Sequence, residues 1–475
     1  MSGALAELLC GALTSCVQGI ESVAGECETS NRLLALAEKV QRALAGQGIA
    51  PNEPVHIVIG NRPSDLGALL GIWQAGAVAV PIHVTAAAST VERVGRVSRA
   101  RFSIDGERLD VIAAALPPDR PLLRDAALII FTSGSTGEPK GVVIGHQRLA
   151  DKLAVLDPLL KIRTDDIVLL PLQITFIFGL WVSLLALSKG ARLVLVPKFT
   201  SETMTKGLAE ATVLGGVPSM FRTLLSYPGI DTPKLRAILT GGEVLPATLA
   251  RALLQFAPVT IHDLYGLTET GSCDFCLSPA DQPQGFGTIG RPTGRVEFRL
   301  QRDGRAVAPG EIGELQIRTP FGMFGYLDNP ALTTASFEGD YFRTGDLARM
   351  TAGGFIEPIG RAKDIISRGG NKIAPLEIDN LLAEHPDVAA ALCAGVPDER
   401  LGEVVHAVVV PRAGAVIDTA ALRDWVAART ERFKVPDIFY IRETLPSGSS
   451  GKADRRAVTQ LAGSARNAGN QKPRT

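Results

Sequence analysis

Runs of apolar residues alternate with amphipathic segments through about the first 360 residues of the chain. Residues 55–59 are apolar apart from His56 and predict a buried strand. Residues 65–75 carry apolar positions at helical spacing, and residues 77–81 predict a second strand. A strand, a helix and a strand in this order favour a parallel sheet covered by helices.

The same order recurs further along the chain. Residues 235–240 predict a strand, residues 246–256 a helix and residues 259–264 another strand. The first of these strands leads into Gly241-Gly242-Glu243, and the second leads into Tyr265-Gly266. Ligands of such sheets bind outside the carboxyl ends of the strands, so we expect the loops to converge on one crevice.

Two later changes of pattern indicate the domain organisation. Residues 285–326 contain short alternating runs and turn dipeptides such as Asp303-Gly304, which predict an antiparallel β subdomain. After Gly360 the pattern predicts a small α+β domain over residues 361–462, beside a large N-terminal domain over residues 1–360. The predicted fold class is therefore α/β, with helix-covered sheets in the large domain.

Within the small domain, Pro375 opens a predicted helix, which is followed by predicted strands at residues 388–396 and 404–410 and by a helix at residues 419–432. Residues 463–475 are polar and predict a disordered tail.

Residues 167–188 contain no charged side chain and are long enough to span a bilayer. Pro171, Gln173 and Gly179 interrupt this segment, which favours a buried strand followed by a buried helix over a membrane span. Residues 1–16 include Glu7 and have no basic leader, so they predict a helix and not a signal peptide.

Composition narrows the class of partner and the compartment. Lys+Arg and Asp+Glu both number 49, so nothing in the overall charge indicates nucleic acid or a membrane surface as a partner. The six cysteines are scattered, unlike a disulfide framework, although Cys273 and Cys276 have the spacing of a redox or zinc pair. A reducing, cytoplasmic location is expected.

A glycine- and hydroxyl-rich loop follows the predicted strand at residues 126–130. It reads Phe131-Thr-Ser-Gly-Ser-Thr-Gly-Glu-Pro-Lys140 and differs from a Walker A motif, which needs a Gly-Lys-Ser/Thr ending. Successive N–H groups of such a loop can form a concave anion site, and hydroxyls and a lysine add donors and charge. We call residues 131–140 the phosphate loop. Its candidate phosphate-binding residues are Thr132, Ser133, Gly134, Ser135, Thr136, Gly137 and Lys140. The alternative interpretation is a flexible surface turn.

Five separated segments, including this loop, together resemble the adenylate-forming superfamily of acyl-CoA synthetases, peptide-synthetase adenylation domains and firefly-type luciferases. The likeness extends from about residue 31 to about residue 460 and is closest to the acyl- and aryl-CoA ligases. The segments are Thr132–Lys140, Tyr265-Gly-Leu-Thr-Glu-Thr270, Tyr341-Phe-Arg-Thr-Gly-Asp346, Gly360-Arg-Ala-Lys-Asp364 with Arg368-Gly-Gly370, and Ser447-Gly-Ser-Ser-Gly-Lys452.

The resemblance implies two half-reactions and a mobile C-terminal domain. A carboxylate first attacks the α-phosphate of ATP and gives an acyl-adenylate and pyrophosphate; a thiol, usually of phosphopantetheine, then displaces AMP. The implied cofactors are ATP, Mg²⁺ and coenzyme A, or phosphopantetheine on an acyl carrier protein. The expected protein is a monomer or homodimer that acts on a small carboxylic acid.

The resemblance also assigns roles to individual residues. Lys452 would bridge the substrate carboxylate and the α-phosphate, because bringing two anions together needs charge screening. Glu269 would hold Mg²⁺ and Thr268 would bond the α-phosphate. A solvated loop lysine is the structural alternative for Lys452.

The nucleotide would contact several further residues. Tyr265 would stack on adenine, with core packing as its alternative, and Asp346 would accept the ribose hydroxyls, with a turn aspartate as its alternative. Arg361 would bind ribose or phosphate oxygens. Residues expected to border the adenine are Gly241, Gly242, Glu243, Asp263 and Gly266.

Other matched positions concern domain motion and the thiol. Lys363 occupies the hinge position of the family, and rotation about it would withdraw Lys452. Arg368, Gly369 and Gly370 would then approach the thiol tunnel; the alternative for Arg368 is an ordinary surface charge. For His146, which follows the phosphate loop, a structural capping role is favoured over catalysis.

The acyl pocket is expected to involve Phe176, Phe178 and Trp181, together with Gly266, Thr270 and Gly271. Amino-acid-adenylating relatives carry an aspartate that pairs with the α-amine, but Ile177 stands here and cannot neutralise an ammonium. The apolar set suits an aryl or medium-chain acid, with plain core packing as the alternative.

These patterns predict an ATP-dependent acid–CoA ligase. The nearest alternative is an enzyme that loads an acyl group onto a carrier protein, since both share the same motifs. A non-catalytic nucleotide sensor is a more remote alternative, and a luciferase-like oxygenase is not excluded by motif.

Overall fold

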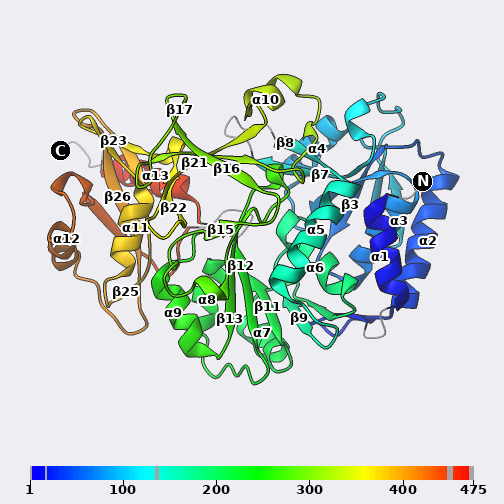
Figure 1. The fold of residues 1–475 in the computed structure, drawn as a ribbon, viewed down its shortest axis with the longest axis horizontal. Coiled ribbons are helices and arrows are strands. Elements are labelled where there is room, and N and C mark those ends of the chain that lie inside the picture. Colours follow the sequence, from blue (N-terminus) through cyan, green and yellow to red (C-terminus); the bar gives the residue numbers. More distant parts are fainter. Residues whose placement is uncertain (1–2, 16–18, 134–138, 447–452, 470–475) are drawn as a thin grey trace, which may run out of the picture.

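The computed structural model describes residues 3–15, 19–133, 139–446 and 453–469. This part of the chain forms four β-sheets with helices packed against them (Figure 1). The C-terminal sheet lies at the opposite end of the molecule from the helices that open the chain (Figure 1). None of the helices in the described ranges is long and apolar enough to cross a membrane.

The first sheet carries the strands on either side of the phosphate loop. Its order is β19-β8-β7-β4-β3-β5-β6, and β5, β3, β4 and β7 run parallel. The bounds are β3 (Pro54–Ile59), β4 (Val78–His83), β5 (Phe102–Asp105), β6 (Arg108–Val111), β7 (Ala126–Ser133), β8 (Pro139–Gly145) and β19 (Gly325–Tyr326). The pairs β7–β8 and β8–β19 are antiparallel, so the phosphate loop joins two antiparallel strands and not a strand to a helix.

The second sheet confirms the parallel arrangement predicted for residues 235–264. Its order is β15-β14-β13-β12-β11-β9-β10-β1-β2, parallel from β1 to β13. The bounds are β1 (Ile20–Ser22), β2 (Cys27–Glu28), β9 (Ile167–Leu170), β10 (Arg192–Leu195), β11 (Val213–Gly216), β12 (Ala237–Gly241), β13 (Thr260–Tyr265), β14 (Phe275–Leu277) and β15 (Arg291–Pro292). Two of the candidate ligand loops follow the adjacent strands β12 and β13.

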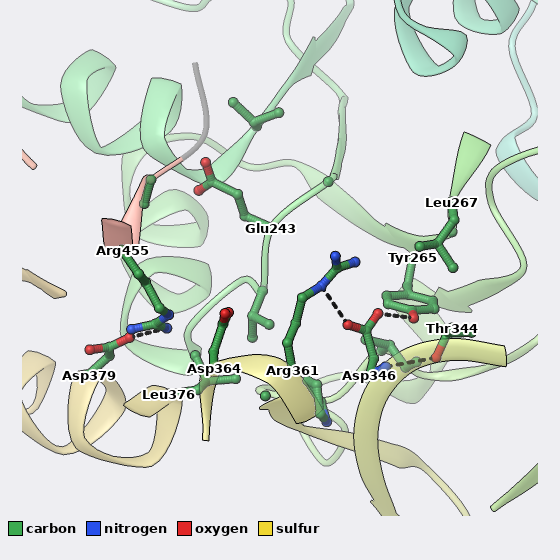
Figure 2. A pocket seen from close by; sticks show the side chains of 18 of the residues that line it. Glu243, Tyr265, Leu267, Thr344, Asp346, Arg361, Asp364, Leu376, Asp379 and Arg455 are labelled. Carbon is green, nitrogen blue, oxygen red and sulfur yellow. Dashed lines mark hydrogen bonds and ion pairs between the residues drawn. The ribbon is translucent and has the colours of Figure 1, made fainter. Parts of the chain in front are cut away.

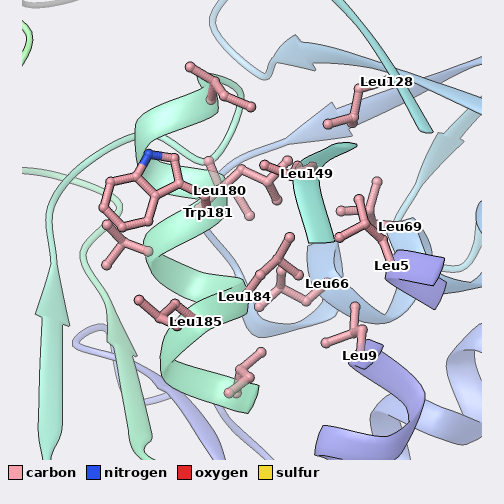
Figure 3. Packing of buried hydrophobic residues seen from close by; sticks show 14 of the residues in the cluster. Leu5, Leu9, Leu66, Leu69, Leu128, Leu149, Leu180, Trp181, Leu184 and Leu185 are labelled. Carbon is pink, nitrogen blue, oxygen red and sulfur yellow. The ribbon is translucent and has the colours of Figure 1, made fainter. Parts of the chain in front are cut away.

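One hydrophobic core joins these two sheets through the helices between them. Leu5 and Leu9 of the first helix pack near Leu66 and Leu69, and Trp181 and Leu184 lie on the facing helix (Figure 3). The helices of this region are α1 (Ala4–Ser15), α2 (Ser30–Gly46), α3 (Pro63–Gln74), α4 (Ala88–Ser98), α5 (His146–Leu160), α6 (Ile177–Ser188), α7 (Ser201–Leu208), α8 (Pro218–Ser226) and α9 (Ala247–Phe256). α6 is buried along nearly its whole length, which explains the uncharged segment at residues 167–188.

Local sequence explains several helix starts. The Thr29 side chain accepts a hydrogen bond from the Arg32 N–H and caps α2. Pro63 opens α3, where the Asp65 carboxylate accepts the Arg62 N–H at 2.9 Å, and Pro218 opens α8. These signals place α3 and α8 directly after strands of the two sheets.

The predicted antiparallel β subdomain is present but extends beyond residue 326. A six-stranded antiparallel sheet runs to Arg361, because strands that follow the 285–326 segment pair back onto it. Its strands are β16 (Glu297–Arg302), β17 (Arg305–Ala306), β18 (Gly313–Arg318), β20 (Phe337–Glu338), β21 (Tyr341–Met350) and β22 (Ile356–Arg361). The short helix α10 (Pro330–Ala335) lies between β19 and β20.

The C-terminal sheet has the order β24-β23-β26-β25, with β27 beside β26. Its elements are β23 (Ile366–Arg368), β24 (Asn371–Ile373), α11 (Pro375–Ala383), β25 (Val388–Asp398), β26 (Gly402–Pro411), α12 (Thr419–Ala427), β27 (Ile438–Ile441) and α13 (Arg455–Gly469).

Two predictions for the C-terminal region need correction. The helix predicted to reach Arg432 ends at Ala427. The segment predicted to be disordered from Gly463 is helical as far as Gly469, because it continues the helix α13, which begins at Arg455.

Candidate functional site

A cavity of about 1400 Å³ lies where the ends of the two large sheets meet the antiparallel sheet and the C-terminal domain. Side chains and backbone from β7, β8, β13, β21, β22 and α11 all line it. The candidate loops therefore converge on one crevice, as their positions after strands predict. The phosphate loop itself is represented by Thr132 and Lys140, since Gly134, Ser135, Thr136 and Gly137 lie outside the described residues.

A chain of polar contacts crosses the middle of the cavity (Figure 2). The Tyr265 hydroxyl donates to one Asp346 carboxylate oxygen at 2.5 Å, and the Arg361 Nε lies 2.8 Å from the other. The Asp346 N–H donates to the Thr344 hydroxyl at 3.0 Å, which fixes the backbone. Burial raises the pKa of the Tyr265 phenol well above its usual value, and the Asp346 charge adds to this. Tyr265 is therefore a permanent donor that orients the Asp346 carboxylate.

The loop after β12 supplies a second acidic group. Gly242 has φ +80°, a conformation that favours glycine, and turns the chain so that Glu243 lines the cavity. Ser219 donates to one Glu243 oxygen at 3.1 Å, and the Arg222 guanidinium lies 3.9 Å from the other. Burial lowers the pKa of Arg222, partly offset by Glu243. Arg222 was missed from the sequence, since it belongs to none of the five motifs.

Glu269 and Lys140 are brought together by Tyr326 of β19. The Tyr326 hydroxyl donates to the Glu269 carboxylate at 3.0 Å, and the Lys140 ammonium lies 5.6 Å from the Tyr326 ring centroid. The Met323 N–H donates to the Glu269 backbone carbonyl at 2.8 Å. These contacts place one carboxylate beside the end of the phosphate loop, with Thr268 also lining the cavity. Tyr326 was another residue that the motifs did not reveal.

Of the residues predicted for the acyl pocket, Phe176, Phe178 and Gly266 line the cavity. Trp181, Thr270 and Gly271 are not among the described residues that line it. Trp181 is fully buried in the core (Figure 3). Its indole N–H donates to the Ser272 hydroxyl at 3.3 Å. Trp181 therefore stands behind Ser272, which does line the cavity.

Thr270 and Gly271 determine the local backbone conformation and do not line the cavity. The short 3₁₀ helix Thr268–Thr270 ends at Gly271, which has φ +82°. A Cβ atom at Gly271 would meet the Phe321 carbonyl oxygen at 2.5 Å, and one at Gly266 would meet the Cys273 nitrogen at 2.3 Å. The glycines are required by close packing, and the buried Thr270 hydroxyl turns away from the cavity to Asp274.

Two residues predicted to border the adenine are also displaced from the cavity wall. Asp263 is buried within β13, and burial raises the pKa of its carboxyl well above the usual value. Gly241 lies against the next strand, where an added Cβ would meet the Leu264 carbonyl oxygen at 2.3 Å. Gly242 and Glu243 line the cavity, whereas Asp263 and Gly241 are absent from its described lining.

The C-terminal domain borders the cavity through Lys363, Asp364, α11 and Arg455. Arg455 pairs with Asp379 of α11 at 2.5 Å (Figure 2). It also donates to the Cys393 carbonyl at 2.5 Å. The Asp454 N–H donates to the Pro446 carbonyl at 2.9 Å. Lys452 lies outside the described residues, but the chain on both sides of its segment is anchored by these bonds.

The predicted thiol-tunnel residues lie away from the cavity within the described chain. The Arg368 guanidinium pairs with Asp437 at 2.7 Å and donates to the Phe433 and Val435 carbonyls at 2.9 and 3.1 Å. Gly369 and Gly370 have φ values of +53° and +85° and form the tight turn between β23 and β24. In this arrangement Arg368 therefore stabilises the C-terminal domain through bonds to three of its residues and is not a free surface charge.

The capping role predicted for His146 is wrong, because Gly145 is the N-cap of α5 and no described side chain caps the helix. His146 is the first residue of α5 and is buried, with its ring 5.5 Å from the Trp73 ring in an edge arrangement. Burial lowers the pKa of His146 to about 4, so the ring is neutral near pH 7.

No group of three or more His, Cys, Asp or Glu side chains within the described ranges could hold a metal ion by itself. Mg²⁺ is commonly held by one or two carboxylates together with substrate phosphates, so a single glutamate beside a phosphate loop is a suitable donor set. Glu269 fits this pattern, because Tyr326 engages only one of its carboxylate oxygens through a described hydrogen bond.

Comparison with known proteins identifies the family of the chain. The profile of the AMP-binding enzyme family matches residues 23–327, and that of the AMP-binding enzyme C-terminal domain matches residues 377–452. A feruloyl-CoA synthase of an Amycolatopsis species is 32% identical over 453 residues, which cover 90% of this chain and 91% of that protein.

Two solved structures are also similar to this chain over nearly its whole length. ATP-bound MatB from Rhodopseudomonas palustris matches with a TM-score of 0.85 and 25% identity, over 96% of this chain and 98% of that one. The o-succinylbenzoate CoA synthetase of Bacillus subtilis, in complex with an acyl-adenylate intermediate, matches with a TM-score of 0.82 and 25% identity over 98% of both chains. The chain described here belongs to the AMP-binding enzyme family.

Proposed function

We propose that the chain is an ATP-dependent ligase that joins a small carboxylic acid to the thiol of coenzyme A through an acyl-adenylate. The observation that carries the proposal is the single cavity in which Asp346, Arg361, Glu269 and Lys140 surround one space. A ribose acceptor, two cations and a carboxylate suited to magnesium are what a nucleoside triphosphate requires.

In the first half-reaction a substrate carboxylate oxygen attacks the α-phosphorus, and the bond to the β-phosphate oxygen breaks to release pyrophosphate. Both reactants are anions, so positive charge at the meeting point lowers the barrier most. Lys140 flanks the phosphate loop, and Lys452 is the family match for the bridging cation. Glu269 would hold magnesium, which neutralises phosphate charge when bound.

Asp346 and Tyr265 would hold the nucleoside. The Tyr265 hydroxyl and Arg361 fix the Asp346 carboxylate, so it can accept ribose hydroxyls without reorganising. Tyr265 is partly buried at the cavity wall, where a flat ring suits adenine.

In the second half-reaction the thiol sulfur attacks the acyl carbonyl, and AMP leaves with the bonding pair. We propose that the C-terminal domain rotates about Lys363 between the two steps. Lys363 lies in the exposed 3₁₀ turn Ala362–Asp364 between β22 and β23, a short connection that suits a hinge.

The proposed substrate is an aryl or medium-chain acid. Phe176, Phe178, Met220 and Leu267 give the cavity an apolar side, whereas an ammonium group would find Ile177 at the position where an aspartate would be needed. A feruloyl-CoA synthase among the relatives is consistent with an aryl acid.

The test is AMP release from ATP and magnesium across aryl, aliphatic, dicarboxylic and amino acids, each with and without coenzyme A. We expect release with one acid class and a steep rise with coenzyme A, and none from the Asp346→Ala variant. Acid-dependent pyrophosphate exchange without a coenzyme A effect would favour a carrier protein as acceptor. No turnover with any acid would contradict the ligase and favour a nucleotide sensor.

A further inference from the structure

A fully buried ion pair lies behind the segment that carries Thr268 and Glu269. The Lys152 ammonium of α5 lies 3.5 Å from the Asp274 carboxylate, and neither side chain is exposed to solvent. Neither residue is among the described residues lining the cavity. Burying two charges costs several kcal/mol for each ion, and an apolar pair of similar volume is often at least as stable. Stability alone is therefore a weak explanation for this pair.

Asp274 closes the loop that begins at Tyr265. Its N–H donates to the Tyr265 carbonyl at 2.7 Å, and its carboxylate accepts a hydrogen bond from the Thr270 hydroxyl. The same hydroxyl accepts the Leu267 N–H at 3.2 Å. The backbone on either side of Thr268 and Glu269 is thus tied to one buried carboxylate.

α5 also contacts the segment at residues 321–323. Arg148, one turn before Lys152, donates to the Gly322 and Met323 carbonyls at 2.7 Å each. The Lys152 ammonium lies 5.1 Å from the Phe321 ring centroid. Since the Met323 N–H donates to the Glu269 carbonyl, α5 supports the Glu269 backbone from two directions.

We infer that Lys152 is a positioning residue that, through Asp274 and Thr270, fixes the Thr268–Glu269 backbone so that the Glu269 carboxylate faces the phosphate loop. The inference rests on the proposed function, because it assigns Glu269 to the ATP–magnesium complex. Lys152 itself touches neither nucleotide nor acid. Without its cation, the buried carboxylate would be left unpaired and its bond to Thr270 would change.

The experiment compares Lys152→Met, Asp274→Asn and the double variant with wild-type protein. Lys234→Met, which alters an exposed lysine, is the matched control. Three quantities are measured: the melting temperature, the KM for ATP–magnesium in pyrophosphate exchange, and amide hydrogen exchange of Leu267, Thr270 and Ser272.

Each single variant should lower the melting temperature, and the double variant should recover most of the loss. The double variant should still show a roughly tenfold higher KM for ATP–magnesium, about 1.4 kcal/mol, and faster exchange at the three amides. Thiolation of a supplied acyl-adenylate should be unchanged. A double variant with wild-type KM and wild-type exchange would overturn the inference, whatever its melting temperature, because the pair would then not position the Thr268–Glu269 segment.

Thr270→Val provides a second, smaller change that leaves the ion pair in place. It removes only the hydroxyl, and it should reproduce the raised KM and the faster exchange at Leu267. Unchanged values in this variant would also overturn the inference. If wild-type protein formed no adenylate, the proposed function would fail, whereas the exchange measurements would still report whether Lys152 orders the segment.

Discussion

The Tyr265 hydroxyl donates a 2.5 Å hydrogen bond to Asp346, a residue 81 positions later in the chain. The other Asp346 oxygen is engaged by Arg361 at 2.8 Å. Both carboxylate oxygens are therefore held by protein groups, so a bound ribose must share them with Tyr265 and Arg361. This arrangement makes the orientation of Asp346 dependent on a phenol from a different sheet.

Replacing Tyr265 by phenylalanine should weaken nucleotide binding while preserving the ring. Loss of one hydrogen bond to a charged group is worth about 1.5–3 kcal/mol, so we expect the KM for ATP to rise about tenfold or more. Pyrophosphate exchange at saturating acid measures the effect. Tyr341→Phe, on β21 but absent from the described cavity lining, is the matched control. An unchanged KM in Tyr265→Phe would show that nucleotide binding does not depend on the hydrogen bond from Tyr265 to Asp346.

Variants of Phe178 and Trp181 should distinguish a residue of the cavity lining from a residue of the hydrophobic core. Phe178 lines the cavity, so Phe178→Ala should change the relative kcat/KM for acids of different size by about tenfold, with less effect on stability. Trp181→Phe should instead lower the free energy of unfolding by about 1–3 kcal/mol through a cavity and an unpaired Ser272 hydroxyl. Its ranking of acids should stay the same. An altered ranking in Trp181→Phe with native stability would return Trp181 to the acyl pocket.

Lys452→Ala should abolish adenylate formation and spare thiolation of a supplied acyl-adenylate. The first step brings two anions together and needs a cation between them. In the second step the thiol attacks an acyl-adenylate that has already formed, so this cation is no longer required. Both half-reactions are measured separately, by pyrophosphate exchange and by thioester formation. Retention of most of the exchange activity would show that another cation performs this role.

Acid stability should depend on the buried His56, whose Nε2 lies 2.9 Å from the Ser98 hydroxyl oxygen. Burial lowers the pKa of His56 from 6.5 to about 4. The unfolded chain therefore takes up a proton first, and stability is lost as the pH falls from about 6.5 towards about 4. Between about pH 7.5 and 5.5 the loss attributable to His56 is about 1 kcal/mol.

The His56→Gln variant should lose less stability on acidification by about that amount. Denaturant unfolding of both proteins at the two pH values measures the difference, and the comparison cancels the contributions of other titrating groups. Equal losses in the two proteins would mean that the pKa of His56 is the same in the native and the unfolded state.

Local patterns predicted the elements that position the site. Apolar runs and turn residues identified β3, α3, β12, α9 and β13 to within a few residues, because each element is determined mainly by its own sequence. The convergence of the loops followed from the rule for parallel sheets. The phosphate-binding role of residues 131–140, inferred from their glycines and hydroxyls, stays a prediction, and the antiparallel strand β8 that follows the loop was not anticipated.

The individual side chains of the site were harder to predict, since their partners are distant in sequence. Arg222, Tyr326 and Arg455 carry no local signal, and each is identified only by what it meets across the fold. Thr270 was placed in the wrong environment for a similar reason: its hydroxyl turns inward to Asp274, which no periodicity indicates.

The segment at residues 447–452 has a consequence for how the protein could be inhibited. Its two flanks are joined by the Asp454–Pro446 hydrogen bond, and Arg455 fastens them to α11 and β25. In the rotation that we propose, both flanks of the segment move with the C-terminal domain, because these bonds lie within it. A small molecule bound between that domain and α9 would block this motion. It would then prevent activation of the acid without occupying or altering the nucleotide site.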